Sequence, residues 1–268
     1  MDETAEFLTA LLSRGPDEPT ACPKWRVRDL VAHMAAGAQE ESDLIEAALD
    51  GQAARPTRTF EEREAAYRAL AYEDLLSALA REGSRLSGAI DRLEATGGRV
   101  AFTGMTLDAA AFRTHTRSEL ALHRWDLIGD DEVGDELLAQ PDLTAHTAAV
   151  LTQMSGLQES IARRAAGVAG LPETFALRSP GHHDVLIRTR PGPAIEITHA
   201  EPDVPVIRCD ASTRLLVLWG RATDRADFTA LPEKTTDPIK AFLHVGRQDH
   251  DHDEQRPRIG QEIRNVTG

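Results

Sequence analysis

The residues best placed to do chemistry lie in the segment 113–127, where Glu119 and His123 stand four positions apart in a helical pattern. At about 100° per residue, these two side chains project within roughly 40° of each other, one turn apart. A carboxylate and an imidazole on one face of a helix can bind the same metal ion. The same spacing also occurs in solvated pairs on surface helices, so a third ligand from another element must decide between these interpretations.

Two histidines are candidates for that third ligand. His33 lies in the segment 30–34, whose other residues have the pattern of a buried helix face, and we take it as the first choice. A histidine at such a position can equally be a satisfied core residue. His115 extends the H-x3-E-x3-H row on the same helix, but its direction differs from that of His123 by about 80°, so it is the second choice.

Two imidazoles and one carboxylate that converge inside a helical bundle form a donor set typical of a catalytic zinc site. Three protein ligands leave the fourth tetrahedral position open for water or substrate. Nitrogen and oxygen donors suit zinc better than calcium or magnesium. We therefore predict one Zn²⁺ per chain on His33, Glu119 and His123, with Asp126 orienting a ligand histidine.

The elements that must position these residues change character along the chain. Residues 1–167 are rich in alanine and carry leucines at three- and four-residue spacing, which predicts a helical bundle. Residues 170–245 contain short alternating runs, which predict strands and a small α+β domain. Residues 246–268 are charged, include histidines that could bind adventitious metal, and are predicted to form a disordered tail. The predicted fold class is α+β.

The individual elements follow from the same patterns. Helices are expected near 3–13, 26–49, 75–97, 107–128 and 143–166. Strands are expected over 174–177, 185–190, 194–198 and 205–209. Helical spacing resumes over 212–219, with Asp210 or Ser212 placed as its cap.

Composition limits the possible partners. A formal net charge of −14, from 44 acidic and 30 basic residues, disfavours nucleic acid and anionic membranes. No apolar stretch approaches the roughly 20 residues of a membrane span, and the acidic start lacks the basic region of a secretory signal, so we expect a cytoplasmic protein. Cys22 and Cys209 are too few for a thiolate-built zinc site, so a metal must use histidine and carboxylate.

Three segments carry recognisable motifs: 22–34 (CPKWRVRDLVAHM), 117–127 (RSELALHRWDL) and 215–221 (LLVLWGR). The first two resemble the opening motif and the second metal motif of the mycothiol-dependent maleylpyruvate isomerase family, on a DinB-like four-helix bundle. The third is similar to a segment of that family's smaller C-terminal domain, which resembles sterol carrier protein folds. The resemblance covers about residues 5–245.

This resemblance implies zinc on His33, Glu119 and His123, the three residues that the helical geometry also selects. It further implies that Arg63 and Arg221 help to bind an anionic substrate. Two other interpretations remain open, because Arg63 could belong to a solvated helix start and Arg221 could cap the carbonyls of the preceding helix.

The resemblance also implies a reaction, in which the sulfur of mycothiol adds to the cis double bond of maleylpyruvate. Rotation and elimination would then give the trans product, fumarylpyruvate, and free thiol. Zinc would activate the thiol, because a free thiol has a pKa near 8.5 and coordination to a dication deprotonates it. The expected partners are a low-molecular-weight thiol and a small anionic or electrophilic substrate, with the chain as monomer or homodimer.

Other functions fit the same residues. A mycothiol-dependent S-transferase would keep the sulfur on the product, as in detoxification or natural-product biosynthesis. A non-catalytic protein would keep the ligands and bind a small molecule in its second domain. A zinc hydrolase would need a general base, for which His115 or Asp126 are the candidates.

Overall fold

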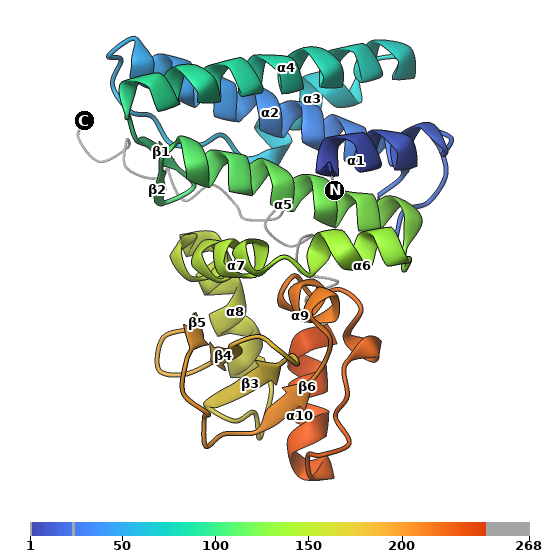
Figure 1. Ribbon diagram of the computed structural model, residues 1–268, viewed down its shortest axis with the longest axis vertical. Helices are drawn as coiled ribbons and strands as arrows, with labels where there is room; N and C mark the ends of the chain where they lie inside the picture. Colours follow the sequence, from blue (N-terminus) through green and yellow to red (C-terminus); the bar gives the residue numbers. More distant parts are fainter. Residues whose placement is uncertain (1, 23–24, 245–268) are drawn as a thin grey trace, which may run out of the picture.

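The computed structural model describes residues 2–22 and 25–244, with a layer of long helices above a small sheet (Figure 1). The predicted α+β fold class is confirmed. The helices are α1 (Glu3–Leu12), α2 (Val27–Leu49), α3 (Phe60–Arg68), α4 (Tyr72–Thr96), α5 (Ala109–Ile128), α6 (Glu132–Leu138), α7 (Pro141–Gln153), α8 (Ser155–Gly167), α9 (Ala211–Leu218) and α10 (Glu233–His244). The strands are β1 (Val100–Phe102), β2 (Met105–Leu107), β3 (Thr174–Arg178), β4 (Asp184–Arg188), β5 (Ala194–Thr198) and β6 (Val206–Arg208). The predicted tail over 246–268 lies outside the described residues.

The helical layer is built on α2 and α4, which pack along each other and bury their apolar stripes together with α1 and α5. Leu30 and Val31 of α2 are fully buried beside Leu75 of α4 and Phe7 of α1. Helix α4 closes at Gly97, whose φ of 63° lies in the left-handed region that glycine tolerates. This packing fixes the long axis of α2 relative to α5, which carry the predicted ligands.

The predicted helix over 143–166 is wrong as a single element. The chain breaks at Met154, which adopts an extended conformation (φ −73°, ψ 110°) between α7 and α8. The break has a packing reason, because α7 packs against α5 and β5, while Ile161 and Ala165 of α8 join the core under the sheet. A single straight helix could not pack against α5 and also bury Ile161 and Ala165 in the core under the sheet.

The expected helix start at residue 107 is also wrong, because Leu107 belongs to a short hairpin. Val100 pairs with Leu107 in an antiparallel ladder between β1 and β2. Helix α5 begins after Asp108, whose side chain accepts a hydrogen bond from the Ala111 N–H at 2.9 Å. Strands of three residues are too short for an alternating pattern to reveal them.

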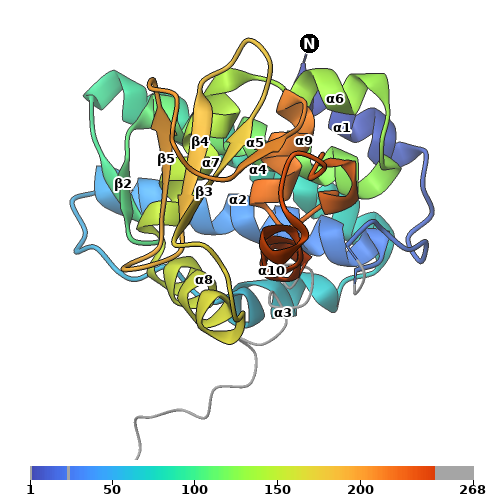
Figure 2. The same cartoon turned by 90° about the horizontal axis from the view of Figure 1, so that it is seen from below.

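The sheet has the order β5-β4-β3-β6, antiparallel except between β3 and β6. Phe175, Val185 and Ile207 are fully buried in a core that also contains residues of α8 and α10. Seen from below, α8 and α10 lie along one side of the strands (Figure 2). Helix α9 starts at Asp210, which caps the Thr213 N–H at 2.7 Å as the sequence predicted.

The division of the chain into domains at 1–167 and 170–245 stays a prediction. Helix α7 packs against both α5 of the helical layer and β5 of the sheet, so the two layers share it. Within residues 2–22 and 25–244, none of the helices combines the length and apolar character that a membrane crossing requires.

Candidate metal centre

The structure brings the three predicted ligands together from two helices. The ligand atoms of His33 on α2 and of Glu119 and His123 on α5 all lie within 4.8 Å of one another. Oε2 of Glu119 lies 3.9 Å from Nε2 of His33 and 3.3 Å from Nε2 of His123. Donor atoms about 2 Å from a tetrahedral ion are separated by roughly 3.4 Å, so small side-chain adjustments can direct all three at one ion.

Each ligand histidine is held from behind by a carboxylate. Nδ1 of His33 lies 2.7 Å from Oε1 of Glu64, and Nδ1 of His123 lies 2.9 Å from Oδ2 of Asp126. A carboxylate at Nδ1 keeps the proton on that nitrogen and leaves the Nε2 lone pair for a metal. The sequence predicted this role for Asp126 but missed Glu64, although the Thr59–Glu62 capping box marks the start of its helix.

Both carboxylates are anchored by arginines. Arg68 donates to Oε2 of Glu64 at 2.7 Å, and Arg221 forms a two-point contact with Asp126 at 2.8 and 2.9 Å. Burial disfavours the charged form of Asp126, but Arg221 and the His123 hydrogen bond outweigh it and hold the pKa of this carboxyl well below its usual range. Arg221 follows α9, so this contact ties the C-terminal part of the chain to the metal centre.

The predicted substrate role of Arg221 stays a prediction, since its guanidinium is engaged with Asp126. Arg221 also donates to the carbonyl of Trp219 at 3.3 Å, as the alternative interpretation of a helix cap requires. Because Arg221 holds the Asp126 carboxylate, and this carboxylate contacts Nδ1 of His123, Arg221 helps to fix the orientation of the His123 ring.

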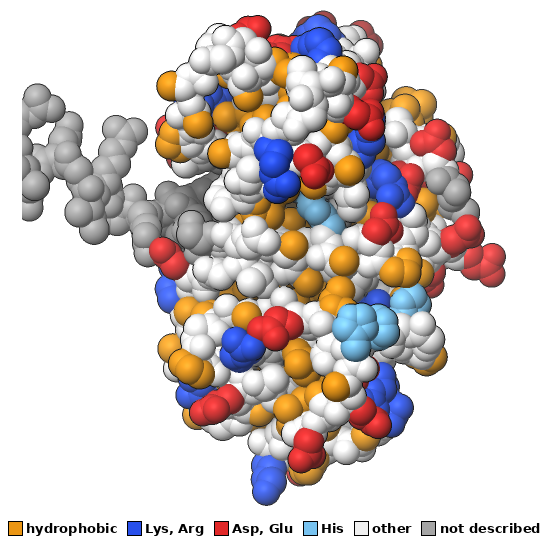
Figure 3. Space-filling view, turned by 60° about the vertical axis from the view of Figure 1, so that its left-hand side comes forward, with side chains coloured by type: hydrophobic (Ala, Val, Ile, Leu, Met, Phe, Trp, Pro, Cys, Tyr) orange, Lys and Arg blue, Asp and Glu red, His pale blue; other side chains and the backbone are white. Residues whose placement is uncertain are grey.

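Aromatic side chains border the centre. The ring centroid of Trp25 lies 4.8 Å from that of His33 and 5.8 Å from that of His123. Phe60, which is 52% exposed, lies 5.3 Å from His33 on the other side. These rings limit the access of water to the histidines. On the face shown in Figure 3, histidine side chains reach the surface in the middle and in the lower half of the molecule.

Arg63 is buried beside this centre without a counter-ion. Its side chain lies on α3 with the guanidinium carbon 4.4 Å from the ring centroid of Phe60. Within the described part of the chain it forms no hydrogen bond or ion pair, and its Nε is fully buried. Burial lowers the pKa of Arg63, and nearby carboxylates offset this only partly. The residue is therefore not part of a solvated helix start, but a buried cationic group that lacks a hydrogen-bonded anion among the described residues.

His115, the second choice for a ligand, is not among the converging donors. Its Nδ1 lies 3.0 Å from Nε2 of His146 on α7, and its Nε2 lies 3.7 Å from Oε1 of Glu41 on α2. Sequence reasoning missed Glu41 and His146, because no motif spacing connects residues on three separate helices.

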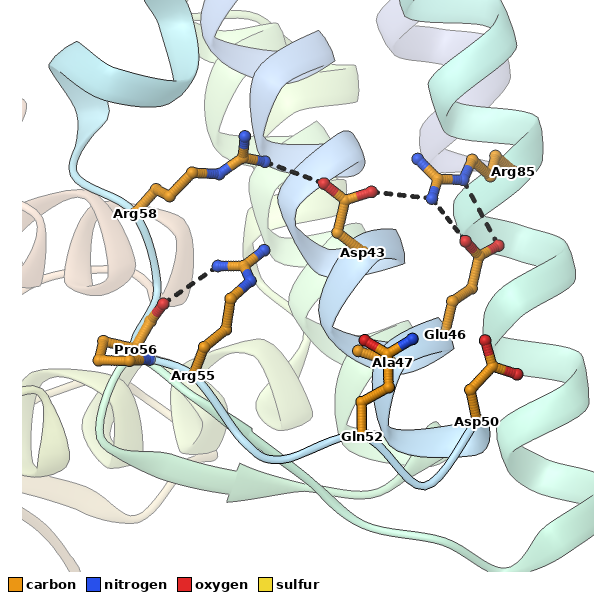
Figure 4. A pocket seen from close by; sticks show the side chains of 9 residues that line it. All are labelled: Asp43, Glu46, Ala47, Asp50, Gln52, Arg55, Pro56, Arg58 and Arg85. Atoms are coloured by element: carbon orange, nitrogen blue, oxygen red, sulfur yellow. Dashed lines mark hydrogen bonds and ion pairs between the residues drawn. The ribbon is translucent and has the colours of Figure 1, made fainter.

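A second charged region lies at the other end of α2. A pocket of about 590 Å³ is bordered there by Asp43, Glu46 and Arg85 and by the loop that carries Arg55 and Arg58 (Figure 4). Arg85 contacts Asp43 at 2.8 Å and Glu46 at 2.5 Å, while Arg58 contacts Asp43 at 3.0 Å. Asp43 and Glu46 are thus paired with arginines, in contrast to the converging histidine and carboxylate donors of the metal centre.

Comparison with known proteins gives two kinds of match. Residues 1–128 match the family model described as the mycothiol maleylpyruvate isomerase N-terminal domain. Two solved structures share the fold, with 19% and 18% identity: mycothiol-dependent maleylpyruvate isomerase and a histidine-to-alanine mutant of that enzyme. Each match covers 86% of this chain and 91% of the other, with a TM-score of 0.60. A search of curated proteins found no match.

Proposed function

Residues 1–128 of this chain belong to the mycothiol maleylpyruvate isomerase N-terminal domain family, and from this premise we propose a zinc-dependent enzyme that uses mycothiol. It would add the activated thiolate to an electrophilic, unsaturated small molecule. The observation that carries the proposal is the convergence of His33, Glu119 and His123 within 4.8 Å. The cytoplasmic location and the monomeric or homodimeric state stay parts of this proposal.

The donor set supports zinc as the metal. Two imidazole nitrogens and one carboxylate oxygen, each histidine backed by a carboxylate, are the donors and supporting groups of known catalytic zinc sites. Zinc held there would supply a thiolate at neutral pH, because coordination deprotonates a thiol. The chain's own part is to fix the two rings through Glu64 and Asp126 and to keep water away with Trp25.

The surroundings support an anionic substrate. The guanidinium of Arg63 has no counter-ion among the described residues, and guanidinium groups bind carboxylates through paired hydrogen bonds. A substrate carboxylate held by Arg63 would orient an adjacent double bond toward the sulfur. Maleylpyruvate, a dicarboxylate with an activated cis double bond, meets these requirements. Arg221 would bind the second carboxylate if its guanidinium contacted the substrate as well as Asp126.

The addition product has two possible fates, which define two candidate functions. Elimination after rotation about the new single bond returns the thiol and gives the trans isomer, as in maleylpyruvate isomerase, and family membership puts this function first. Protonation instead leaves the sulfur on the product, as in an S-transferase. The second function is favoured by one specific observation, the buried Glu41 and the part-buried His115 and His146 near the centre.

The proposal is tested by incubating the zinc-loaded full-length protein with mycothiol and maleylpyruvate. We expect substrate loss that requires both zinc and thiol, with fumarylpyruvate or a mycothiol thioether detected by mass spectrometry. His33→Ala should abolish both products, whereas Glu46→Gln in the paired arginine pocket should retain them. Formation of neither product by the zinc-loaded protein would contradict the proposal.

A further inference from the structure

Three side chains from three helices lie in a row beside the metal centre, with one hydrogen-bond contact and one longer charge contact between them. Glu41 lies on α2, His115 on α5 and His146 on α7. Nε2 of His146 lies 3.0 Å from Nδ1 of His115, and the opposite nitrogen of His115 lies 3.7 Å from Oε1 of Glu41. Glu41 is 6% exposed, and its second oxygen, Oε2, is buried without a hydrogen-bond partner among the described residues.

The row is not a second metal site. His115 uses its two ring nitrogens in opposite directions, so its neighbours cannot share one ion with it. A contact of 3.0 Å between two imidazole nitrogens instead requires a single proton between them. When His115 gains a proton on one nitrogen it can release one from the other, which is how an imidazole passes a proton along a row.

The row ends close to the proposed reaction. His115 precedes Glu119 by one turn of α5, about 6 Å along the axis, and Glu41 follows His33 by about 12 Å on α2. Arg63 lies near both Glu41 and Glu119, because the charges of these two carboxylates act on its guanidinium. A substrate anchored at Arg63, with its double bond facing the ligands, therefore lies beside Glu41.

The buried environment determines which groups carry protons. Burial raises the pKa of Glu41 to about 7, an increase that Glu119 reinforces and that His115, Arg63 and His33 oppose. Burial also lowers the pKa of His146 to about 4, and the charge of His115 contributes. Near neutral pH, Glu41 thus holds a proton for a large part of the time, and His146 is a neutral imidazole that can relay one.

We propose that Glu41 donates a proton to the carbanion formed by thiolate addition, and that His115 and His146 replace this proton, so that the product is a saturated mycothiol thioether. This inference rests on the proposed function and selects its S-transferase outcome. In this role Glu41 is a catalytic residue, whereas His115 and His146 act through it.

The atoms and electrons balance without a further reactant. The thiol first loses its proton, and a sulfur electron pair then forms the new C–S bond. The π electrons of the double bond move to the neighbouring carbon, which is stabilised as an enolate by the adjoining carbonyl. The Glu41 proton forms the new C–H bond, the proton released by the thiol goes to solvent, and a proton taken up from solvent at His146 returns to Glu41 through His115.

The test measures how the adduct is partitioned. Zinc-loaded full-length protein reacts with mycothiol and maleylpyruvate in D₂O, and mass spectrometry and NMR quantify the deuterated thioether and fumarylpyruvate. We expect the thioether to dominate, and Glu41→Gln to shift the ratio toward fumarylpyruvate by at least about 100-fold, the low end of general-acid effects. His146→Gln should shift it less, and Glu46→Gln should leave it unchanged.

Two further measurements separate the possible failures. Zinc content should be the same in wild type and Glu41→Gln, and ¹⁵N NMR of the metal-free protein should show a proton shared by His115 and His146 that His146→Gln removes. If wild type gives fumarylpyruvate with free mycothiol, or if Glu41→Gln leaves the ratio unchanged, the proton-donor role is overturned while the proposed function stands. If zinc-loaded protein forms neither product, both are overturned.

Discussion

Two charged regions share helix α2 and differ in how their charges are compensated. At the end that carries Asp43 and Glu46, the carboxylates are paired with arginines at 2.5–3.0 Å. Near His33, three ligand atoms from two helices lie within 4.8 Å of one another, and Arg63 is buried with no ion pair among the described residues. The difference teaches that charge density alone does not identify a functional site, whereas the convergence of donor atoms from two helices is a more specific sign.

The physical basis of this contrast is desolvation. A buried polar or charged group without a partner costs several kcal/mol, so a fold retains one only where other contacts hold it in place. Around the centre, Glu64 and Asp126 supply those contacts for the two histidines. In the arginine pocket, the carboxylates of Asp43 and Glu46 are already paired with arginines.

The largest effect is expected from removing a metal ligand. His33→Ala or Glu119→Ala should lower bound zinc from about one ion per chain to none and reduce turnover by more than about 10³-fold, because two remaining ligands hold zinc weakly. Metal analysis of the full-length variants against wild type checks this, since any ion held by the histidines of residues 246–268 cancels in the difference. If either variant kept the zinc content of wild type, the region near His33 would not be a metal site and would not differ in function from the arginine pocket.

Arg63 should show the next largest effect, with opposite signs for activity and stability. Arg63→Gln removes the proposed carboxylate contact, and a hydrogen bond to a charged group contributes about 1.5–3 kcal/mol, equivalent to roughly 10- to 150-fold in kcat/KM. The free energy of unfolding should stay equal or rise, because a buried unpaired charge is lost. Steady-state kinetics measures kcat/KM, and urea unfolding measures the free energy of unfolding. A strongly destabilised variant would show instead that Arg63 stabilises the fold.

A smaller effect is expected behind the ligands. Asp126→Asn keeps the size of the side chain but removes the charge that faces His123 and Arg221, and such changes lower metal affinity about 10- to 100-fold. Competition with a zinc chelator measures this affinity. Arg92→Gln, which removes a partner of Glu46 at 2.8 Å far from the centre, is the matched control and should leave zinc affinity unchanged.

The sequence predicted the ligands better than their surroundings. Glu119 and His123 are four positions apart on one helix, and His33 lies within a buried helical pattern. These local patterns were sufficient to predict the three ligands. Glu64, Glu41 and His146 were missed because their roles arise only when α2, α3, α5 and α7 pack together. The break at Met154 was missed for the same reason, since two cores compete for one apolar stretch.

The smallest effect is expected at Glu40, which has a structural role only. Glu40 is fully buried and accepts hydrogen bonds from Arg55 and Arg58. Burial alone would raise its pKa, but these contacts outweigh burial and lower it from 4.5 to about 2. Its contribution to stability is therefore complete above pH 4.5 and is lost as the pH falls toward 2.

Glu40→Gln should thus lower the free energy of unfolding at pH 7 by about 1.5–3 kcal/mol, the range for hydrogen bonds to charged groups. The difference from wild type should shrink between pH 4.5 and pH 2, because protonated Glu40 resembles glutamine. Urea unfolding at several pH values measures this trend, and zinc affinity should not change. A stability difference that stays constant with pH would mean that the shape of Glu40, and not its charge, holds the two arginines.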